Sequence, residues 1–208
     1  MDTLERALRT VEVQPFSAEL AARTSELLDE TGTLSVPALE ELVCRLADRP
    51  DLWQPLVVVD RERRRYELLY EDERVDVWVL SWMPGQQTGF HDHDRSGVGL
   101  VCVQGELDER GLAIASGAET VRITPGMSRS GPGGYIHAVG HGAGEPAVSI
   151  HAYSPPLAQV GQYRRDPHGR LRREPEPGRK ELFDDTIGAG AVREPPSGAP
   201  PQVSGSSR

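Results

Sequence analysis

The sequence predicts a mainly β fold, a barrel or sandwich preceded by helices, and three observations point to it. Glycine and proline contribute 22 and 17 of the 208 residues, which favours a turn-rich architecture over a helical bundle. Short β-rich runs separated by turn residues recur between positions 56 and 153. The first fifty residues instead follow the hydrophobic period of helices. A chain of this length usually forms one compact domain.

Two helices are expected in the N-terminal segment, residues 1–50, which we expect to pack on the barrel. Ser17 can cap a helix that runs roughly to Glu30, and Ser35 or Pro37 opens a second one through Ala47. A serine hydroxyl at such a position accepts a hydrogen bond from a backbone N–H of the first turn.

The predicted strands lie between Leu56 and Tyr153, and their runs read LVVV, YELLY, VDVWVLSW, VGLVCVQGEL, ETVRIT and AVSIHAYS. The run VDVWVLSW alternates, because Val75, Val77, Val79 and Ser81 fall on one face and Asp76, Trp78, Leu80 and Trp82 on the other. We expect Trp78 and Trp82 to fill the barrel core. The barrel domain with its C-terminal extension is placed at residues 51–187, and residues 188–208, which offer almost nothing to bury, are expected to be disordered.

Charge and composition exclude several classes of protein. The formal net charge of -9 makes a nucleic-acid partner a poor expectation, since phosphate backbones would be repelled. No stretch approaches the roughly 18 apolar residues of a membrane span, and the N-terminus lacks a signal-peptide core, so we expect a cytoplasmic protein with no membrane partner. Cys44 and Cys102 lie in apolar runs and are expected to be free thiols. We expect a monomer or a weak homo-oligomer.

Five of the six histidines fall between positions 91 and 151. His91 and His93 are two residues apart, so on a strand their imidazoles emerge on the same face, within reach of one ion. Neutral imidazole binds zinc, copper, iron or nickel, and His137 is the leading candidate for a third ligand. The alternative is a pair of exposed turn histidines flanked by aspartates.

Glycines and prolines around these histidines resemble the two motifs of the cupin family. The first motif is matched by Gly85, His91, His93 and Gly105, and the second by Gly126, Pro132, Gly134 and His137. The resemblance implies a single cupin domain, a jelly-roll-like β-barrel, with these histidines at its mouth. The glutamate ligand of the first motif would fall at Gly97 or Val98, so the implied site has three histidines and no carboxylate.

Two segments, WMPGQQTGFHDHDRSG and SIHAYSPPL, together resemble the cysteine dioxygenase family of thiol dioxygenases. The resemblance covers roughly Trp78 to Leu157. It implies that His91, His93 and His137 hold ferrous iron, Fe²⁺, and that a small thiol, most simply L-cysteine, is oxidised by O₂ to a sulfinic acid. It also implies that Ser149, His151 and Tyr153 form the catalytic relay of that family.

The residue chemistry of Ser149, His151 and Tyr153 agrees with such a relay. The three side chains alternate along one predicted strand, so a hydroxyl, an imidazole and a phenol share a face and can hydrogen-bond in a row. The alternative is a core-facing strand end whose tyrosine bonds to backbone. Animal family members crosslink this tyrosine to a cysteine, but Val98 or Gly99 stands at that place, so Tyr153 is expected to be unmodified.

The resemblance also implies an anchor for the substrate carboxylate. The family holds the substrate carboxylate with an arginine upstream of the first motif, and by distance from Trp82 this role falls near Arg65 or Tyr66. Alternatively, Arg65 belongs to a solvated charge run, and Arg164 or Arg165 holds the substrate. The thiol would then be another one, such as 3-mercaptopropionate, cysteamine or ergothioneine. A third possibility is a metal-binding cupin without catalysis.

Overall fold

The computed structural model of the chain describes residues 32–113, 117–168 and 170–177, with isolated positions at 18, 21–22, 24–25 and 27. The expected disordered tail, residues 188–208, and most of the helix expected between Ser17 and Glu30 lie outside these residues. Within the described ranges, no helix combines the length and apolar character needed to cross a membrane.

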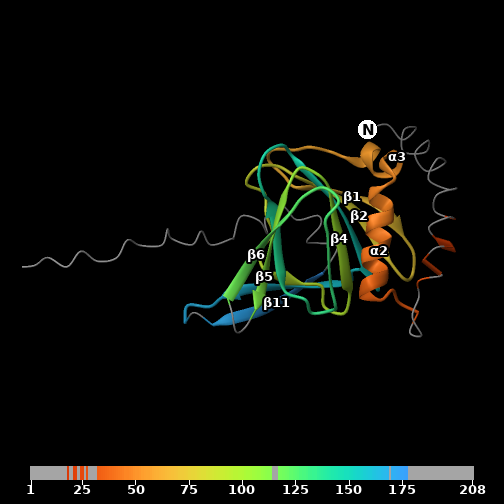
Figure 1. The fold of residues 1–208 in the computed structure, drawn as a ribbon. Coiled ribbons are helices and arrows are strands. Elements are labelled where there is room, and N and C mark those ends of the chain that lie inside the picture. Colours follow the sequence, from red (N-terminus) through yellow and green to blue (C-terminus); the bar gives the residue numbers. More distant parts are fainter. Residues whose placement is uncertain are drawn as a thin grey trace, which may run out of the picture.

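Two antiparallel sheets face each other and form the jelly-roll-like barrel, so the expected mainly β cupin fold is confirmed (Figure 1). One sheet has five strands in the order β1-β2-β9-β4-β7, and the other has six in the order β11-β10-β3-β8-β5-β6. The strands are β1 (Arg65–Glu71), β2 (Asp76–Trp82), β3 (His91–Asp92), β4 (Gly97–Gln104), β5 (Leu107–Ala113), β6 (Gly117–Ile123), β7 (Ser128–Gly131), β8 (His137–His141), β9 (Ala147–Ser154), β10 (Gln159–Arg165) and β11 (Leu171–Pro177).

The described helices are α2 (Val36–Ala47), α3 (Pro50–Trp53) and the 3₁₀ turn η1 (Gln54–Leu56). Ser35 caps α2 as expected, because its hydroxyl accepts the backbone N–H of Ala38 at 3.4 Å. The prediction of a strand at LVVV was wrong. Leu56 ends the 3₁₀ turn, and Val58 and Val59 lie exposed in the connection to β1, where no neighbouring strand pairs with them. A short apolar run without alternation does not specify a strand on its own.

Strand β2 separates two hydrophobic cores, as its alternation predicted. Val75, just before the strand, and Val77 and Val79 on it pack toward the helix side, with Leu39 and Leu42 of α2. Trp78, Leu80 and Trp82 face the space between the two sheets. Helix α2 therefore covers the outer face of the five-stranded sheet, along β4 and β9 (Figure 1). The inner core, between the sheets, surrounds the candidate site.

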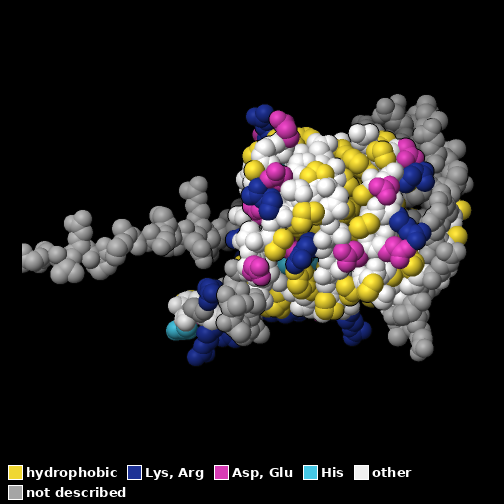
Figure 2. Space-filling view, viewed as in Figure 1, with side chains coloured by type: hydrophobic (Ala, Val, Ile, Leu, Met, Phe, Trp, Pro, Cys, Tyr) yellow, Lys and Arg dark blue, Asp and Glu magenta, His cyan; other side chains and the backbone are white. Residues whose placement is uncertain are grey.

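The turn that leads from β4 in one sheet to β5 in the other requires a glycine. Gly105 has a φ of +66°, and a Cβ there would lie 2.7 Å from Cα of Ala147 on β9. The second glycine of the first motif thus permits both the turn and the close approach of two strands. On the outer surface, acidic and basic side chains are interspersed, as Figure 2 shows for one face.

Candidate active site

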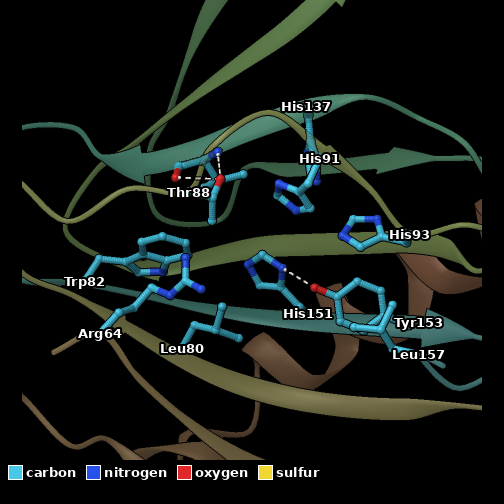
Figure 3. A pocket seen from close by; sticks show the side chains of 11 residues that line it. Arg64, Leu80, Trp82, Thr88, His91, His93, His137, His151, Tyr153 and Leu157 are labelled. Carbon is cyan, nitrogen blue, oxygen red and sulfur yellow. Dashed lines mark hydrogen bonds between the residues drawn. The ribbon is translucent and has the colours of Figure 1, made fainter. Parts of the chain in front are cut away.

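Strand pairing brings the three predicted ligand histidines together. His91 on β3 is the register partner of His137 on β8, and His93 follows two residues after His91. One ring nitrogen from each of the three residues lies within 4.8 Å of the others. All three side chains are buried, and their rings point toward one another at one end of the pocket (Figure 3). The geometry therefore fits the predicted three-histidine group and excludes exposed turn histidines.

The hydrogen bonds of the imidazoles leave nitrogen atoms available for a cation. Nδ1 of His91 lies 3.0 Å from the carbonyl oxygen of Gly89, so its N–H donates there and Nε2 carries the lone pair. Nδ1 of His137 lies 2.8 Å from Glu109, and its buried Nε2 has no hydrogen-bond partner. Nδ1 of His93 is likewise buried without one. Buried polar atoms usually have partners, so a metal ion would complete the site.

Electrostatics keep His93 neutral. Burial, together with neighbouring His91 and His137, lowers the pKa of His93 well below its usual value. A neutral imidazole is the form that binds a metal. The chemistry of this donor set, three imidazoles and no carboxylate, suits a divalent transition metal.

Glu109 is a functional candidate that the sequence reasoning missed. It lies on β5, is 1% exposed, and accepts hydrogen bonds from His137 at 2.8 Å and from Nε of Arg129 at 2.7 Å. Burial raises the pKa of Glu109, but the hydrogen bonds from His137 and Arg129 outweigh it and lower the pKa overall. The sequence did hold a signal for it: Glu109 is two residues from the apolar Leu107, so on a strand both side chains point to the same, buried face. The carboxylate fixes the tautomer of His137.

The predicted relay forms a continuous hydrogen-bonded row on β9. Oγ of Ser149 lies 2.9 Å from Nε2 of His151, and Nδ1 of His151 lies 3.2 Å from the Tyr153 hydroxyl. Burial, reinforced by the nearby His137, lowers the pKa of His151 to about 3, so the ring is neutral. The phenol ring in turn lies 4.8 Å from the ring of His93.

Trp82 sets the direction of this row, a role beyond the packing that the sequence predicted. Its indole N–H donates to Oγ of Ser149 at 2.9 Å. An indole can only donate, so the serine hydroxyl directs its own proton to Nε2 of His151. The remaining imidazole proton, on Nδ1, then bonds to the oxygen of Tyr153. The Tyr153 side chain at the end of this row lines the pocket.

No described cysteine stands beside Tyr153. Val98, one of the two residues expected at that place, is its register partner on β4. Cys102 pairs instead with Ser149, at the other end of the row, and burial raises the pKa of its thiol to about 11. That thiol bonds to the carbonyl oxygens of Gln104 and Gly105.

A pocket of about 360 Å³, its open mouth included, joins the histidines and the relay to one arginine, Arg64. Its apolar wall is formed by Leu80, Trp82, Val139 and Leu157. The guanidinium of Arg64 lies over the Trp82 ring, with Cζ 5.1 Å from the ring centroid, across the pocket from the three histidines (Figure 3). Its Nε is buried and has no hydrogen-bond partner among the residues that the structure describes. The far end of the pocket therefore offers an unsatisfied cationic donor.

The other predicted substrate residues lie elsewhere. Arg65 does not line the pocket, because its side chain runs toward Asp60 and Glu67, at 4.0 and 3.6 Å. Arg64, the preceding residue, lines the pocket instead, and a bulge shifts the β1–β2 register between Leu68 and Tyr70. Tyr66 packs behind Arg64, with its ring centroid 6.0 Å from the guanidinium carbon. Arg164 is exposed on β10 and pairs with Glu174. Tyr66 and Arg164 therefore do not line the pocket.

Comparison with known proteins shows the family of the chain. The sequence profile of a family described as cysteine dioxygenase type I matches residues 16–166. Cysteine dioxygenase type 1 of Danio rerio is 24% identical over 168 residues, covering 72% of this chain and 80% of the relative.

Solved structures are also similar to the chain. One is a protein with a double-stranded β-helix domain from Klebsiella pneumoniae, with a TM-score of 0.47 and 16% identity, covering 52% of this chain and 91% of its own. Another is a cupin protein from Desulfovibrio desulfuricans, with a TM-score of 0.42 and 22% identity, covering 49% and 91%. Because the family profile spans most of the sequence, the chain belongs to the cysteine dioxygenase type I family.

Proposed function

We propose that the protein is an Fe²⁺-dependent thiol dioxygenase that oxidises L-cysteine with O₂ to cysteine sulfinic acid. Family membership supports a dioxygenase enzyme, and the identity of metal and substrate is our proposal. One observation carries it: a single pocket holds three buried imidazoles at one end and an unsatisfied arginine at the other, with the Tyr153 phenol alongside. This arrangement fits a short substrate with a thiol at one end and a carboxylate at the other.

His91, His93 and His137 would hold the ion. Ferrous iron supplies a centre where the thiol sulfur and O₂ meet, so that RSH and O₂ combine to RSO₂H without an external reductant. Because the three imidazoles are neutral, they would not reduce the 2+ charge of the ion, and this charge would favour the thiolate form of the substrate.

The protein side chains would position the substrate and donate hydrogen bonds to the reacting groups. Arg64 would pair with the substrate carboxylate, for which a guanidinium is the best-matched partner. Tyr153, oriented by His151, Ser149 and Trp82, would donate a hydrogen bond to oxygen or to the substrate. The apolar wall of Leu80, Val139 and Leu157 excludes bulk water and strengthens these polar contacts.

3-Mercaptopropionate is the second candidate substrate. It carries the same thiol and carboxylate as cysteine and lacks only the amine, so Arg64 favours both over cysteamine, which has no carboxylate. The two candidates differ in the amine, which only cysteine carries. The described pocket offers no carboxylate to bind that amine, because the polar residues that line the pocket are arginine, threonine, histidine and tyrosine.

Oxygen uptake tests the proposal. The protein, loaded with Fe²⁺ under nitrogen, is given cysteine, 3-mercaptopropionate, cysteamine and ergothioneine in turn, and products are analysed by mass spectrometry with ¹⁸O₂. We expect uptake with cysteine and a sulfinate that carries two labelled oxygens. His137→Ala should lose both iron retention and turnover. If no thiol supports uptake by protein that retains its iron, the chain is a metal-binding cupin without this activity.

A further inference from the structure

Strand β11 lies beyond the residues that match the family profile, and one of its side chains contacts the segment that carries His91 and His93. The family profile ends at residue 166, whereas β11 covers Leu171–Pro177 and forms the edge of the six-stranded sheet. The order β11-β10-β3 places one strand, β10, between this edge and the strand that carries His91. Arg173 on β11 spans that intervening strand and meets Asp92, the residue between His91 and His93.

The contact is a fully formed polar cluster. Nε and Nη2 of Arg173 each lie 2.7 Å from a different carboxylate oxygen of Asp92, which is a bidentate pair. The hydroxyl of Tyr163 donates to Oδ2 of Asp92 at 2.7 Å, and the backbone N–H of Asp94 donates to Oδ1 at 2.9 Å. Asp92 is only 2% exposed. A buried carboxylate with four donors is held in one orientation.

Strand β10 is shaped to let the arginine pass. Gly161 is the register partner of Asp92 on one side and of Pro175 on the other. A Cβ at Gly161 would lie 2.2 Å from Nε and 2.5 Å from Cζ of Arg173. Any side chain at this position would therefore collide with the guanidinium. A glycine here serves the close approach of a side chain to the backbone.

Strand β3, which carries His91 and Asp92, is short. β3 has two residues, and its register partners are Gly161, Gln162 and His137. Strand alternation points His91 and His93 into the pocket and Asp92 to the opposite face. A rotation of this short strand would turn both imidazoles away together, and the Asp92 cluster opposes that rotation from the outer face.

We propose that Arg173 is a positioning residue of the metal centre: through Asp92 it holds the His91-Asp92-His93 segment in the orientation that presents both imidazoles. Tyr163 supports the same carboxylate, and β11 is thereby part of the site although no residue of it lines the pocket. The inference rests on the metal-binding part of the proposed function only.

A measurement of metal affinity distinguishes this positioning role from a contact that only attaches β10 and β11 to the rest of the sheet. Wild type and Arg173→Gln, both as full chains, are titrated with Co²⁺, and Co²⁺ release into a chelator is timed. Thermal unfolding is recorded without metal. We expect Arg173→Gln to bind Co²⁺ about tenfold more weakly and to release it faster, as loss of a ligand-supporting residue does. Arg173→Lys keeps the charge but not the fork, and should recover part of the affinity.

The matched control is Arg172→Gln on the same strand. Arg172 is exposed and pairs with Asp166, so its loss should leave Co²⁺ affinity unchanged. Tyr163→Phe removes a single hydrogen bond to Asp92 and keeps the test open if Arg173→Gln fails to fold. It should weaken Co²⁺ binding less than Arg173→Gln does. In an Asp92→Asn background, Arg173→Gln should have a smaller effect than in wild type, because the bidentate pair with Asp92 is already lost and only the bond from Nη2 of Arg173 to Asp94, at 3.1 Å, remains.

Equal Co²⁺ affinity of wild type, Arg173→Gln and Tyr163→Phe would overturn the inference, even if the variants melt at lower temperature. Independent effects of Asp92→Asn and Arg173→Gln would overturn the route through Asp92. Oxygen uptake by the Fe²⁺-loaded wild type decides the proposed function separately. The contact between Arg173 and Asp92 can be tested by Co²⁺ binding even if the protein shows no turnover. A wild type that binds no Co²⁺ would refute both.

Discussion

Replacing Arg64 by Gln tests the carboxylate end of the pocket. The substitution keeps a polar but shorter side chain and removes the positively charged guanidinium, whose buried Nε has no hydrogen-bond partner among the described residues. A substrate carboxylate would satisfy this donor. We therefore expect a defect that depends on whether the substrate has a carboxylate.

The magnitude follows from the bond that would be lost. A hydrogen bond to a charged group contributes about 1.5–3 kcal/mol. At about 1.4 kcal/mol per factor of ten, kcat/KM for cysteine should fall about 10- to 100-fold. Since the contact is made in the bound substrate as well as in the transition state, most of the loss should be a higher KM. For cysteamine, kcat/KM should change little.

Steady-state oxygen uptake with both thiols measures this difference. The control is Arg65→Gln, one residue along, whose side chain lies outside the pocket beside Asp60 and Glu67. It should leave both substrates unaffected. Equal losses for cysteine and cysteamine in Arg64→Gln, or the larger loss in Arg65→Gln, would refute the assignment of the anchor.

Three further predictions concern the relay, the metal support and pH. Tyr153→Phe should retain Co²⁺ but lower kcat about 100-fold, as loss of a positioned proton donor does; an unchanged kcat would contradict the relay. Glu109→Gln should weaken Co²⁺ binding about 10- to 100-fold while exposed Glu106→Gln does not; equal affinities would contradict the orienting role. Burial raises the pKa of Asp76 to about 6, so its contribution to stability is present below about pH 4 and lost by pH 6. Denaturant unfolding should therefore show Asp76→Asn gaining on wild type between those values, and a constant difference would contradict this.

Local rules were enough to predict the parts of the site that lie on one strand. His91 and His93, and likewise Ser149, His151 and Tyr153, share a face because strand side chains alternate, and the structure places each set as expected. The capping of α2 by Ser35 follows from a similarly local hydrogen bond. Such features need no knowledge of which strands are neighbours.

Long-range features could not be predicted in this way. Arg64 rather than Arg65 lines the pocket, and the bulge that shifts the register between β1 and β2 leaves no clear trace in a single sequence. Glu109 meets His137 only because β5 pairs with β8, and this pairing depends on the whole sheet order. The contact of Arg173 with Asp92 likewise needs β10 to lie between their strands.

The three histidines proposed as metal ligands are supported unequally, and this asymmetry explains why a contact outside the pocket matters. His91 is oriented by the Gly89 carbonyl and His137 by the Glu109 carboxylate, each through Nδ1. Among the described residues, none bonds to Nδ1 of His93, which is left for the ion, and the ring is positioned by packing against Tyr153 and by the backbone that carries it. That backbone follows directly after Asp92, whose carboxylate is held by Arg173. The strand beyond the family match thus supports the ligand that lacks a hydrogen bond of its own, which is why removing its arginine should be felt first in metal binding.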